Sequence, residues 1–535
     1  MGPGVVLSTS RIPELVIGEQ DLDLDLFMAV CEGRAGVRLG ADARVLVDRC
    51  NDFRVKLAGS ERRVYGVNTG FGRLADTVIP PAQQVQLQKN LVRSHAVGSG
   101  VVLSREETRG MILLRAMSLS HGFSGARVDV VEQLLWLLEA DLHPWIPSRG
   151  SVGASGDLAP LSHLALVLMG EGHVLDEKGN RVETGPVMAS LGRRPLELQA
   201  KEGLALINGT QMMNSIGLLS VSRALNLIGR ATLAAALSLE ALEGSAQPFG
   251  QEYHRLRPHP EIEDVAACFR ALLEGSEIMS AHHDCARVQD PYSLRCSPQV
   301  LGSSLGVARS AAAVFLREAQ AVTDNPVLFP DRELVVTGGH FHGQPLAHQL
   351  DFLYQAVSEI ANIAERRINL LLGGNGGRLP RFLAAEPGLE SGLMIVQYLA
   401  AGLVTENKSK AFPAAVDSVP TSDGQEDHVS MGSVSALKLN GVLERTETVV
   451  ALELMTATRA LQFITREDLA TSAGRVPLGL SEPLKDLLAE IEKISQPDPS
   501  DRSLSDDVER LSAWVRGGEL PEATLAGLGS LKNSI

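Results

Sequence analysis

The chain has 535 residues and a formal net charge of −15 at pH 7, with 44% hydrophobic and 21% charged residues. This composition is that of a globular protein, and the length allows two to four domains, or one large helical core with a smaller domain. The negative charge argues against a nucleic-acid partner, which would require a basic face, and no uninterrupted apolar run is long enough to span a bilayer. The sequence therefore predicts neither a nucleic-acid nor a membrane partner.

The cysteines are few, scattered and odd in number, and none forms a C-x-x-C pair: Cys31, Cys50, Cys268, Cys285 and Cys296. This pattern argues against a disulfide framework and a zinc site, and it favours a reducing compartment. The first residues also lack the basic flank and long apolar run of a secretory signal. We therefore expect a cytoplasmic protein without a metal.

Short helical segments and turns make up the first two hundred residues. Residues 83–95 read as a helix, and residues 105–142 have apolar side chains spaced by three or four. A glycine-rich loop at residues 65–72 reads Tyr-Gly-Val-Asn-Thr-Gly-Phe-Gly and lacks the Gly-Lys-Ser/Thr of a phosphate-binding loop. Two interpretations of this loop remain open: a turn with a buried Tyr65, or a loop that holds the Tyr65 hydroxyl over a site.

A second loop, at residues 149–163, reads Arg-Gly-Ser-Val-Gly-Ala-Ser-Gly-Asp-Leu-Ala-Pro-Leu-Ser-His. A flexible connection before a helix is one interpretation, since glycines permit tight backbone conformations. The order Ala154-Ser155-Gly156 offers another, because in a sharply bent loop the Gly156 nitrogen can attack the Ala154 carbonyl carbon. Loss of water from that ring and from the Ser155 side chain would leave a methylidene-imidazolone. This ring is an electrophile, whereas ordinary catalytic side chains are acids, bases and nucleophiles.

The chain changes character at about residue 211. Long segments rich in Ala, Leu and Glu carry apolar residues at helical spacing: 211–246, 301–323, 347–373, 391–411 and 433–463. Several exceed the mean helix length of about 11–12 residues. We expect a mainly α fold, an elongated bundle of long helices with a smaller N-terminal domain that carries the ring-forming loop. The expected domains are 1–200, the bundle at 201–495, and a tail at 496–535 that begins with a Pro/Ser/Asp-rich linker and contains short helices.

Residues 150–162 resemble the signature of the histidine and aromatic amino-acid ammonia-lyases and aminomutases. The resemblance extends from about residue 65 to about residue 463. It implies that Ala154, Ser155 and Gly156 form the prosthetic ring without an external cofactor, and that Tyr65 is the catalytic base. In the same family, a Ser-His pair such as the one ending at His95 lies in the substrate pocket of enzymes acting on histidine or tyrosine.

Two further blocks match the family. Residues 201–210 resemble the block that places Asn208 beside the ring and the substrate carboxylate, although Asn-Gly alone would be read as a turn. Residues 289–296 read Gln-Asp-Pro-Tyr-Ser-Leu-Arg-Cys, and their resemblance implies that Gln289, Tyr292 and Arg295 face the site. Arginine suits a carboxylate because its planar fork makes two charge-assisted hydrogen bonds, but the alternative is a surface arginine.

Residues 338–345 contain Phe341, which corresponds to a pocket-lining aromatic residue of the family. The family usually has Asn where this chain has His340. The pair His340 and His342 could suggest a metal site, but no Asp, Glu or Cys lies at a usual ligand spacing, so we expect no bound metal. The ring-side environment is therefore expected to differ slightly from that of the family.

Residues 425–431, Gln-Glu-Asp-His-Val-Ser-Met, discriminate between substrates. The carboxylate of Glu426 can hold an imidazole N–H, whereas a phenyl ring would leave it buried and unpaired at a cost of several kcal/mol. In the family, Gln-Glu-Asp-His marks the histidine enzymes, and those acting on phenylalanine or tyrosine usually carry an amide here. A solvated acidic loop is the alternative. The block before this one ends Lys410-Ala411-Phe412-Pro413, whereas the histidine enzymes usually have His directly before this proline. Lys410 and Phe412 are therefore unusual and leave room for an altered substrate.

The resemblance implies a carbon–nitrogen lyase that eliminates ammonia from L-histidine to give urocanate. The implied roles follow the motifs: Tyr65 removes the β-proton, Arg295 holds the carboxylate, Glu426 and His95 hold the imidazole, and Asn208, Gln289 and Tyr292 orient the carboxylate and the ring. The family's assembly is a homotetramer with each site built from three chains. Tyr65 is expected to have a lowered pKa, from nearby positive charge or helix N-termini.

Two rival functions remain. A tyrosine or phenylalanine ammonia-lyase, or an aromatic aminomutase with the same ring, would explain His95 equally well but not Glu426. A non-catalytic helical assembly protein would give no reason for Ala-Ser-Gly in a strained loop.

Overall fold

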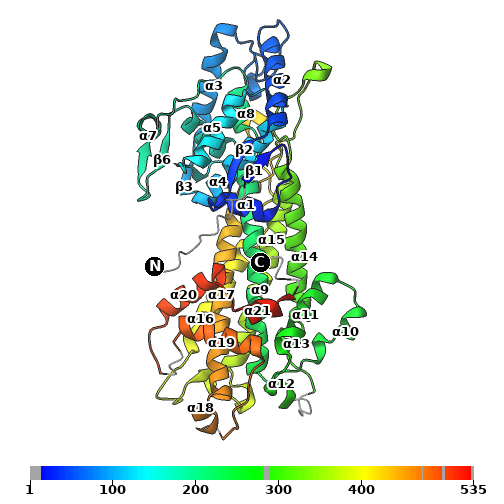
Figure 1. Cartoon of the computed structure of the whole chain (residues 1–535), viewed down its shortest axis with the longest axis vertical. Coiled ribbons are helices and arrows are strands. Elements are labelled where there is room, and N and C mark those ends of the chain that lie inside the picture. Colours follow the sequence, from blue (N-terminus) through cyan, green and yellow to red (C-terminus); the bar gives the residue numbers. More distant parts are fainter. Residues whose placement is uncertain (1–13, 282–287, 473, 497–499, 530, 532–535) are drawn as a thin grey trace, which may run out of the picture. The chain divides into compact units, whose positions relative to one another are not determined.

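The computed structural model of the chain describes residues 14–281, 288–472, 474–496, 500–529 and 531. The N-terminal residues discussed as a possible signal, Cys285 and the first residues of the expected linker lie outside this part. The predicted mainly α fold is confirmed, because long helices dominate and the strands are short (Figure 1).

The first half of the chain forms shorter helices and one long helix: α1 (Leu24–Cys31), α2 (Ala41–Ala58), α3 (Pro81–His95), α4 (Arg105–Ser120), α5 (Val128–Glu139), α6 (Leu158–Leu168), α7 (Thr184–Ser190), α8 (Glu202–Ile207), α9 (Gln211–Ala241), α10 (Gln251–Arg255) and α11 (Pro260–Leu273). The second half forms α12 (Glu277–Ala281), α13 (Tyr292–Arg295), α14 (Ser297–Ala319), α15 (Gln344–Leu372), α16 (Met394–Lys410), α17 (Gly432–Thr465), α18 (Glu467–Ser472), α19 (Glu482–Ile494), α20 (Ser505–Gly517) and α21 (Glu522–Gly527).

The strands form four small sheets. They are β1 (Glu14–Ile17), β2 (Gly36–Leu39), β3 (Ser99–Val102), β4 (His143–Pro144), β5 (Pro147–Arg149), β6 (His173–Leu175), β7 (Arg181–Glu183), β8 (Val327–Phe329) and β9 (Leu334–Val336). β1 and β2 form a parallel pair. The other three sheets are antiparallel: β3 pairs with β5, β6 lies between β4 and β7, and β8 pairs with β9. The β3–β5 pair leads directly into the ring-forming loop and fixes where that loop begins.

Helix caps follow the sequence signals. Ser104 forms a capping box before α4: its hydroxyl accepts from the Glu107 N–H at 3.1 Å, and the Glu107 carboxylate accepts from the Ser104 N–H at 2.8 Å. This reciprocal pair satisfies two N–H groups that the helix itself leaves unpaired. α3 begins at Pro81, whose missing N–H is no loss at the first helical position.

The chain divides into two compact units. Unit 1 comprises residues 1–219, 312–350 and 413–437, and unit 2 comprises residues 220–311, 351–412 and 438–535. This division differs from the expected sequential domains because the long helices α9, α14, α15 and α17 each contribute residues to both units. A boundary read from composition cannot show a chain that passes repeatedly from one unit to the other.

The tail belongs to unit 2 and does not stand apart as a domain. α21 packs against α19 and α11. The Cys268 thiol donates to the Leu528 carbonyl at 2.9 Å, and the Thr524 hydroxyl donates to the Pro483 carbonyl at 2.7 Å. These bonds attach the last described helix to the helices before it.

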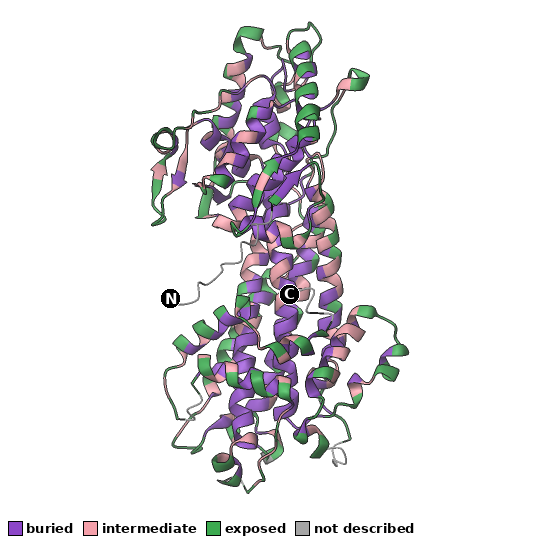
Figure 2. Ribbon diagram, viewed as in Figure 1, coloured by how far each residue is buried: buried purple, intermediate pink, exposed green. Residues whose placement is uncertain are grey.

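Buried side chains concentrate along the helix faces that pack within each unit (Figure 2). In unit 1, one cluster of buried residues comprises Cys50, Phe53, Leu57, Val64, Val67, Ala200 and Leu328. Val64 and Val67 flank the Tyr65-Gly66 pair, so this cluster anchors the glycine-rich loop on both sides of Tyr65.

One helix of the described residues, α14, is long and apolar enough to cross a membrane by length and composition alone. α14 is not an uninterrupted apolar run, because it contains Arg309 and several serines, and its many Ala, Val and Leu residues raise its mean hydropathy. Core helices of soluble proteins pass the same test. Within unit 2, α14 buries Leu301, Leu305 and Ala308, and its Arg309 pairs with Asp264 at 2.7 Å.

Candidate active site

Unit 1 contains a cavity of about 1020 Å³, lined by both glycine-rich loops, the end of α3 and residues 421–426. Eight residues predicted from the sequence line it: Tyr65, His95, Ala154, Ser155, Gly156, Asn208, Phe341 and Glu426. They come from segments more than 350 positions apart, and the fold brings them to one place. The cavity is large enough for a free amino acid.

The loop that carries Tyr65 is held by its own side chains. Asn68 accepts from the Val64 N–H at 2.8 Å and donates to the Arg62 carbonyl at 2.9 Å. Gly66 has φ +69°, a conformation that favours glycine, and a Cβ there would require the Leu204 side chain to move. The Tyr65 ring meets Phe71 edge to face, with centroids 6.2 Å apart. Tyr65 therefore projects from a rigid turn into the cavity.

The expected lowering of the Tyr65 pKa is wrong for the isolated chain. Burial raises the pKa of Tyr65 above its ordinary value, the Gly72 N–H lowers it, and the charge of Glu426 raises it. Burial dominates because it removes water from the phenolate. The groups of this chain around Tyr65 therefore favour its neutral form.

The ring-forming loop is bent by glycines and pinned by serines. Gly153 and Gly156 have φ of +68° and +75°, a region that favours glycine. The Ser151 hydroxyl donates to the Gly156 carbonyl and accepts from the Gly153 N–H, both at 3.0 Å. The Ser430 hydroxyl donates to the Gly153 carbonyl at 3.2 Å, and the Met431 N–H donates to the Val152 carbonyl at 2.9 Å.

The residues around this loop fit a methylidene-imidazolone. A Cβ on Gly156 would collide with the Gly209 carbonyl, so the backbone at Gly156 is closely enclosed. The Asn208 side-chain N–H donates to the Ser155 carbonyl oxygen at 2.9 Å. That oxygen would remain as the carbonyl of the closed ring, because the two lost waters take the Ala154 oxygen and the Ser155 hydroxyl. The donor therefore sits where it would polarise the ring.

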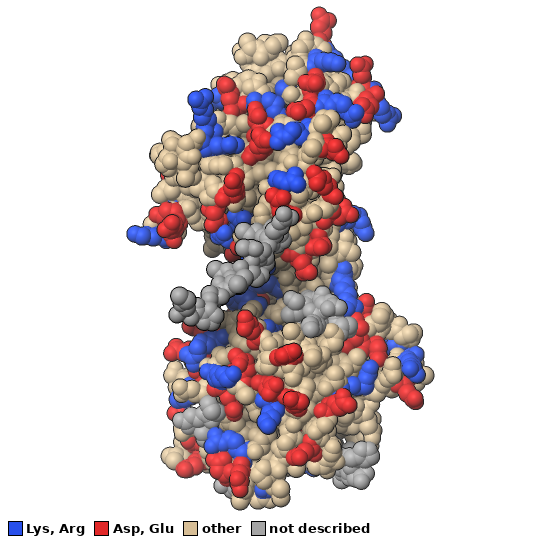
Figure 3. All heavy atoms as spheres, in the orientation of Figure 1, with Lys and Arg blue, Asp and Glu red and all other residues tan. Residues whose placement is uncertain are grey.

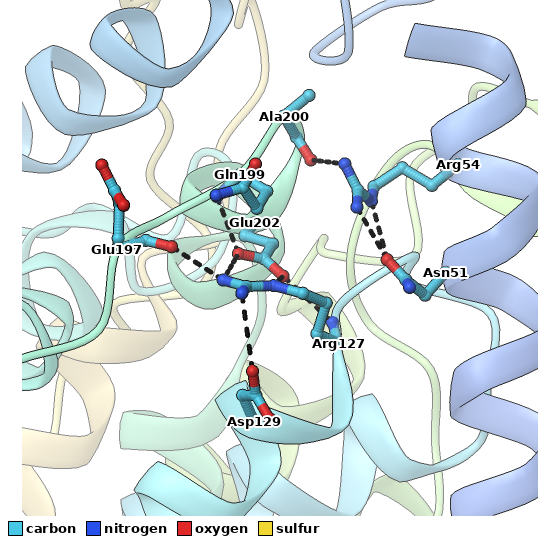
Figure 4. A network of polar contacts seen from close by, with 8 residues as sticks. All are labelled: Asn51, Arg54, Arg127, Asp129, Glu197, Gln199, Ala200 and Glu202. Atoms are coloured by element: carbon cyan, nitrogen blue, oxygen red, sulfur yellow. Dashed lines mark hydrogen bonds and ion pairs between the residues drawn. The ribbon is translucent and has the colours of Figure 1, made fainter.

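Asn208 is placed by α8, which ends at Ile207 just before it. The start of α8 is fixed by a buried polar network (Figure 4). The Glu202 carboxylate, fully buried, accepts from Arg127 Nε at 2.8 Å and from the Gln199 N–H at 2.8 Å. Arg54 donates to the Ala200 carbonyl at 3.4 Å. A short helix anchored in this way holds Asn208 in one position.

Asp157, directly after the ring triad, is fully buried. Its N–H donates to the Gly209 carbonyl at 2.7 Å, and its Oδ2 accepts from the Met213 N–H at 3.0 Å. Its Oδ1 has no hydrogen-bond partner among the described residues. Burial raises the pKa of Asp157 to about 7, so much of the population carries a proton at neutral pH.

His95 ends α3 and lines the cavity. Its Nδ1 lies 2.8 Å from the Leu91 carbonyl and 3.1 Å from the Ser94 hydroxyl. Because a carbonyl can only accept, Nδ1 carries the hydrogen, which leaves Nε2 as an acceptor in the neutral ring. An acceptor at Nε2 suits a substrate N–H or O–H.

Glu426 is presented by a tight turn. Residues 421 and 426 exchange backbone hydrogen bonds across the 3₁₀ turn Ser422–Gly424, and the Thr421 hydroxyl donates to Glu426 Oε2 at 3.4 Å. Thr421 lines the cavity and orients the carboxylate, and the sequence analysis missed it. The only signal was its place in the polar segment before the Gln-Glu-Asp-His block.

The structure places Gln289, Tyr292 and Arg295 together in unit 2, so they do not line the cavity of unit 1. Arg295 donates to Gln289 Oε1 at 3.1 Å and to the Asp290 carbonyl at 2.9 Å. Its guanidinium lies 4.5 Å from the centre of the Tyr292 ring, and Tyr292 is 71% exposed. We call these three residues the exposed arginine cluster.

The positions that depart from the family pattern do not line the cavity of this chain. His340 is exposed in unit 1, beside Phe341, which does line it. Lys410 ends α16 in unit 2, and Phe412, two residues later, is 72% exposed. Within the described residues no group of His, Cys, Asp or Glu side chains is arranged to hold a metal ion.

Known proteins are similar to this chain over nearly its whole length. The aromatic amino acid lyase family model matches residues 22–492. A histidine ammonia-lyase of Gloeobacter violaceus is 46% identical over 97% of this chain and 98% of its own. A solved histidine ammonia-lyase from Trypanosoma cruzi has a TM-score of 0.85 at 37% identity, covering 98% of this chain and 96% of its own. A solved tyrosine aminomutase from Streptomyces globisporus has a TM-score of 0.89 at 35% identity, covering 96% and 99%.

Proposed function

Because this chain belongs to the aromatic amino acid lyase family, we propose that it eliminates ammonia from L-histidine and releases urocanate. It is a carbon–nitrogen lyase with an amino acid as substrate. The observation that carries the histidine assignment is the carboxylate of Glu426 in the same cavity as Tyr65 and the Ala154-Ser155-Gly156 loop. A half-buried carboxylate there pairs with an imidazole N–H, whereas a phenyl ring would cover it without offering a hydrogen-bond donor.

The prosthetic group of the proposal is the methylidene-imidazolone made from Ala154, Ser155 and Gly156. When formed, it supplies an electrophile that turns the substrate amine into a better leaving group. The enclosed backbone at Gly156 and the Asn208 donor on the Ser155 carbonyl support this assignment. Asn208 holds that carbonyl in place and draws electron density from it.

Tyr65 removes the β-proton of the substrate in this proposal. Its hydroxyl projects into the cavity, within the same space as the ring-forming loop. Glu426 and Nε2 of His95 hold the imidazole, which orients the β-carbon toward Tyr65. Fixing the substrate in this way lowers the activation free energy, because the loss of orientational entropy is compensated by binding before the reaction begins.

The carboxylate of the substrate requires a cation, and we assign that role to Arg295 of a second copy of the chain. The exposed arginine cluster lies in unit 2, and Tyr292 is 71% exposed, as a group that serves another chain must be. The same positive charge would favour the tyrosinate form of Tyr65. Gln289 and Tyr292 then orient the carboxylate and the ring.

This assignment requires an oligomer, and we propose a homotetramer with sites shared between chains. Unit 2 exposes a series of large apolar side chains in residues 351–412: Phe352, Leu389, Ile395, Tyr398, Leu399 and Phe412. Several neighbouring apolar residues exposed along one segment are typical of an interface. Closed symmetry would place every copy's cluster at another copy's cavity.

We propose a cytoplasmic enzyme that works on a free small molecule. The four described cysteines are free thiols, which suits a reducing compartment. On the face seen in Figure 3, acidic and basic side chains of the described residues are interspersed, without an extended basic patch. A nucleic acid would require such a patch.

The rival is an aromatic aminomutase, and the similarity to the tyrosine aminomutase structure favours it as the second candidate. A substrate panel of histidine, phenylalanine and tyrosine separates the two. We expect ammonia release and urocanate absorbance with histidine alone. Turnover of tyrosine or phenylalanine in preference to histidine, or formation of a β-amino acid, would reject the histidine lyase.

A further inference from the structure

Arg115 is a buried cation without an assigned role. It lies on α4 in unit 1 and is fully buried. Its hydrogen bonds go to neutral groups: Nη1 donates to the Asn208 carbonyl and to Gln211 Oε1, both at 3.0 Å, and Nη2 donates to the Ser118 hydroxyl at 3.1 Å. Nε has no partner among the described residues. The negative charge of Asp324 also acts on Arg115, but Asp324 is itself paired with Lys201 at 2.8 Å. A buried charge that keeps an unpaired donor destabilises a fold, so stability alone does not explain Arg115.

Arg115 is pressed against the Asn208–Gly209 peptide. A Cβ on Gly209 would collide with Arg115 Nη1 and Gln211 Oε1, and would lie 2.7 Å from Thr323 Oγ1. The guanidinium therefore packs closely against this peptide. Its position is fixed by its bond to Ser118 on the same helix, α4, which begins with a capping box.

Asn208 and Gly209 also contact the ring-forming loop, through the Gly209 carbonyl and the Asn208 side chain. A Cβ on Gly156 would collide with the Gly209 carbonyl. That carbonyl accepts from the Asp157 N–H at 2.7 Å, and the Asn208 side chain donates to the Ser155 carbonyl at 2.9 Å. Residues 208 and 209 thus stand between Arg115 and the residues that close the ring.

We infer that Arg115 is a positioning residue for ring closure, which it promotes by holding the Asn208–Gly209 peptide against the bent 154–156 backbone. This inference rests on the proposed ring. In the reaction, a bond forms between the Gly156 nitrogen and the Ala154 carbon. The Ala154 oxygen leaves as water with the N–H hydrogens of Gly156 and Ser155, and a second water leaves with the Ser155 hydroxyl and the hydrogen of its Cα. Two dehydrations balance the step, and no oxidant is involved.

The physical basis is preorganisation. An amide nitrogen is a weak nucleophile, so closure requires the loop to stay in the reactive bend for long enough. Arg115 makes two contacts near the bend, one to a backbone carbonyl and one to a side chain that also contacts Gly209. A lysine would keep the charge but not the planar fork.

The test measures the mass of newly made full-length protein at intervals after induction. Arg115→Met keeps the volume and removes the donors, and we expect its conversion to the form lighter by two waters to be about ten- to a hundredfold slower than in the wild type. Arg109→Met is the matched control. Arg109 is a second buried arginine on α4, but it bonds to the Val30 and Leu138 carbonyls and to Asp141, away from the loop. We expect the control to close the ring at the wild-type rate.

Each outcome decides between the inference and its alternatives. A folded Arg115→Met protein that loses two waters as fast as the wild type overturns the inference, and so does an equal delay in Arg109→Met. If Arg115→Met does not fold, Arg115→Lys replaces it, with closure expected to be slower than in a matched Arg109→Lys; closure at the wild-type rate overturns the inference. A wild-type protein that never loses two waters rejects the ring itself, and with it the proposed function.

Discussion

The Tyr65 hydroxyl accepts a hydrogen bond of 3.2 Å from the backbone N–H of Gly72. A donor to this oxygen favours the phenolate, which is the form that can remove a proton. Burial and the charge of Glu426 act in the opposite direction and keep the pKa of Tyr65 above its ordinary value in the single chain. The Gly72 contact therefore lowers the pKa of Tyr65 in part, and in our proposal Arg295 of a second copy lowers it further.

Tyr65→Phe removes only the hydroxyl. We expect it to lower the rate of ammonia release by about two to four powers of ten, the usual contribution of a general base. Folding and the two-water mass loss should be unchanged, because the Tyr65 hydroxyl makes no hydrogen bond to the ring-forming loop. Rapid-quench turnover and intact mass measure both. Near-normal turnover would remove Tyr65 from the mechanism and make Tyr292 the first candidate for the base.

Glu426→Gln keeps the shape of the side chain and removes its charge. Loss of a charge-assisted contact of about 1.5–3 kcal/mol should lower histidine turnover by roughly ten- to a hundredfold. Since the Glu426 charge raises the pKa of Tyr65, the rising limb of the rate profile should also move to lower pH. Asp423→Asn is the control, because Asp423 lies on the same turn with its side chain 84% exposed. Unchanged histidine turnover in Glu426→Gln would contradict the histidine assignment.

Ser155→Ala removes the hydroxyl that must leave for the exocyclic methylene to form. The variant should fold, since the loop is held by the Ser151 hydroxyl, which bonds to Gly153 and Gly156, and by the Met431 N–H, which bonds to the Val152 carbonyl. None of these bonds uses the Ser155 hydroxyl. Its peptide covering residues 150–160 should not show the loss of two waters that the wild-type peptide shows. Mass spectrometry of the digested proteins measures this. Active wild-type protein at its full sequence mass would refute the ring.

Asp157 provides a prediction about pH and stability. Burial raises its pKa to about 7 in the folded chain, against about 3.9 in an unfolded chain, so between about pH 4 and pH 7 the folded protein holds a proton that the unfolded chain has released. The free energy of unfolding therefore falls as pH rises through this window, by at most about 4 kcal/mol. Asp157→Asn in the Ser155→Ala background should remove this slope and raise the melting temperature above pH 7. Thermal unfolding from pH 4 to 8 tests this prediction, with Asp423→Asn in the same background as the exposed control. If stability depends on pH equally in the Asp157→Asn and Asp423→Asn proteins, Asp157 does not hold a buried proton.

Much of the fold was predictable because helical spacing is a local property. The long helices expected from residue 211 onward correspond to α9, α14, α15, α16 and α17, and the helix expected at residues 83–95 is α3. The division into units was not predictable, since it depends on which parts of a long helix pack with segments far away in the sequence. The attachment of the tail to unit 2 was not predictable for the same reason, because the bond from the Cys268 thiol to the Leu528 carbonyl leaves no local signal.

The candidate site was predictable where a motif carries its own chemistry. Ala154-Ser155-Gly156 and Glu426 could be read from residue types, and both line the cavity. Thr421 and Arg115 could not, because a threonine in a polar loop and an arginine on an apolar helix have no recognisable pattern. Their importance arises from what they contact: the Glu426 carboxylate and the Asn208 carbonyl.

Complementation between inactive variants tests whether sites are shared between chains. Tyr65→Phe and Arg295→Ala lie in different units, so a mixed assembly can contain cavities with a normal Tyr65 next to a normal Arg295 of another chain. Random mixing of equal amounts should restore up to about a quarter of the wild-type activity.

The control pairs Tyr65→Phe with Asn208→Ala, both lining the cavity of unit 1, and no chain in that mixture carries an intact cavity. Activity should therefore stay absent there. Co-expression, purification through two different tags and a urocanate assay give the measurement. Equal recovery in both mixtures, or none in either, would mean that Arg295 does not act across chains.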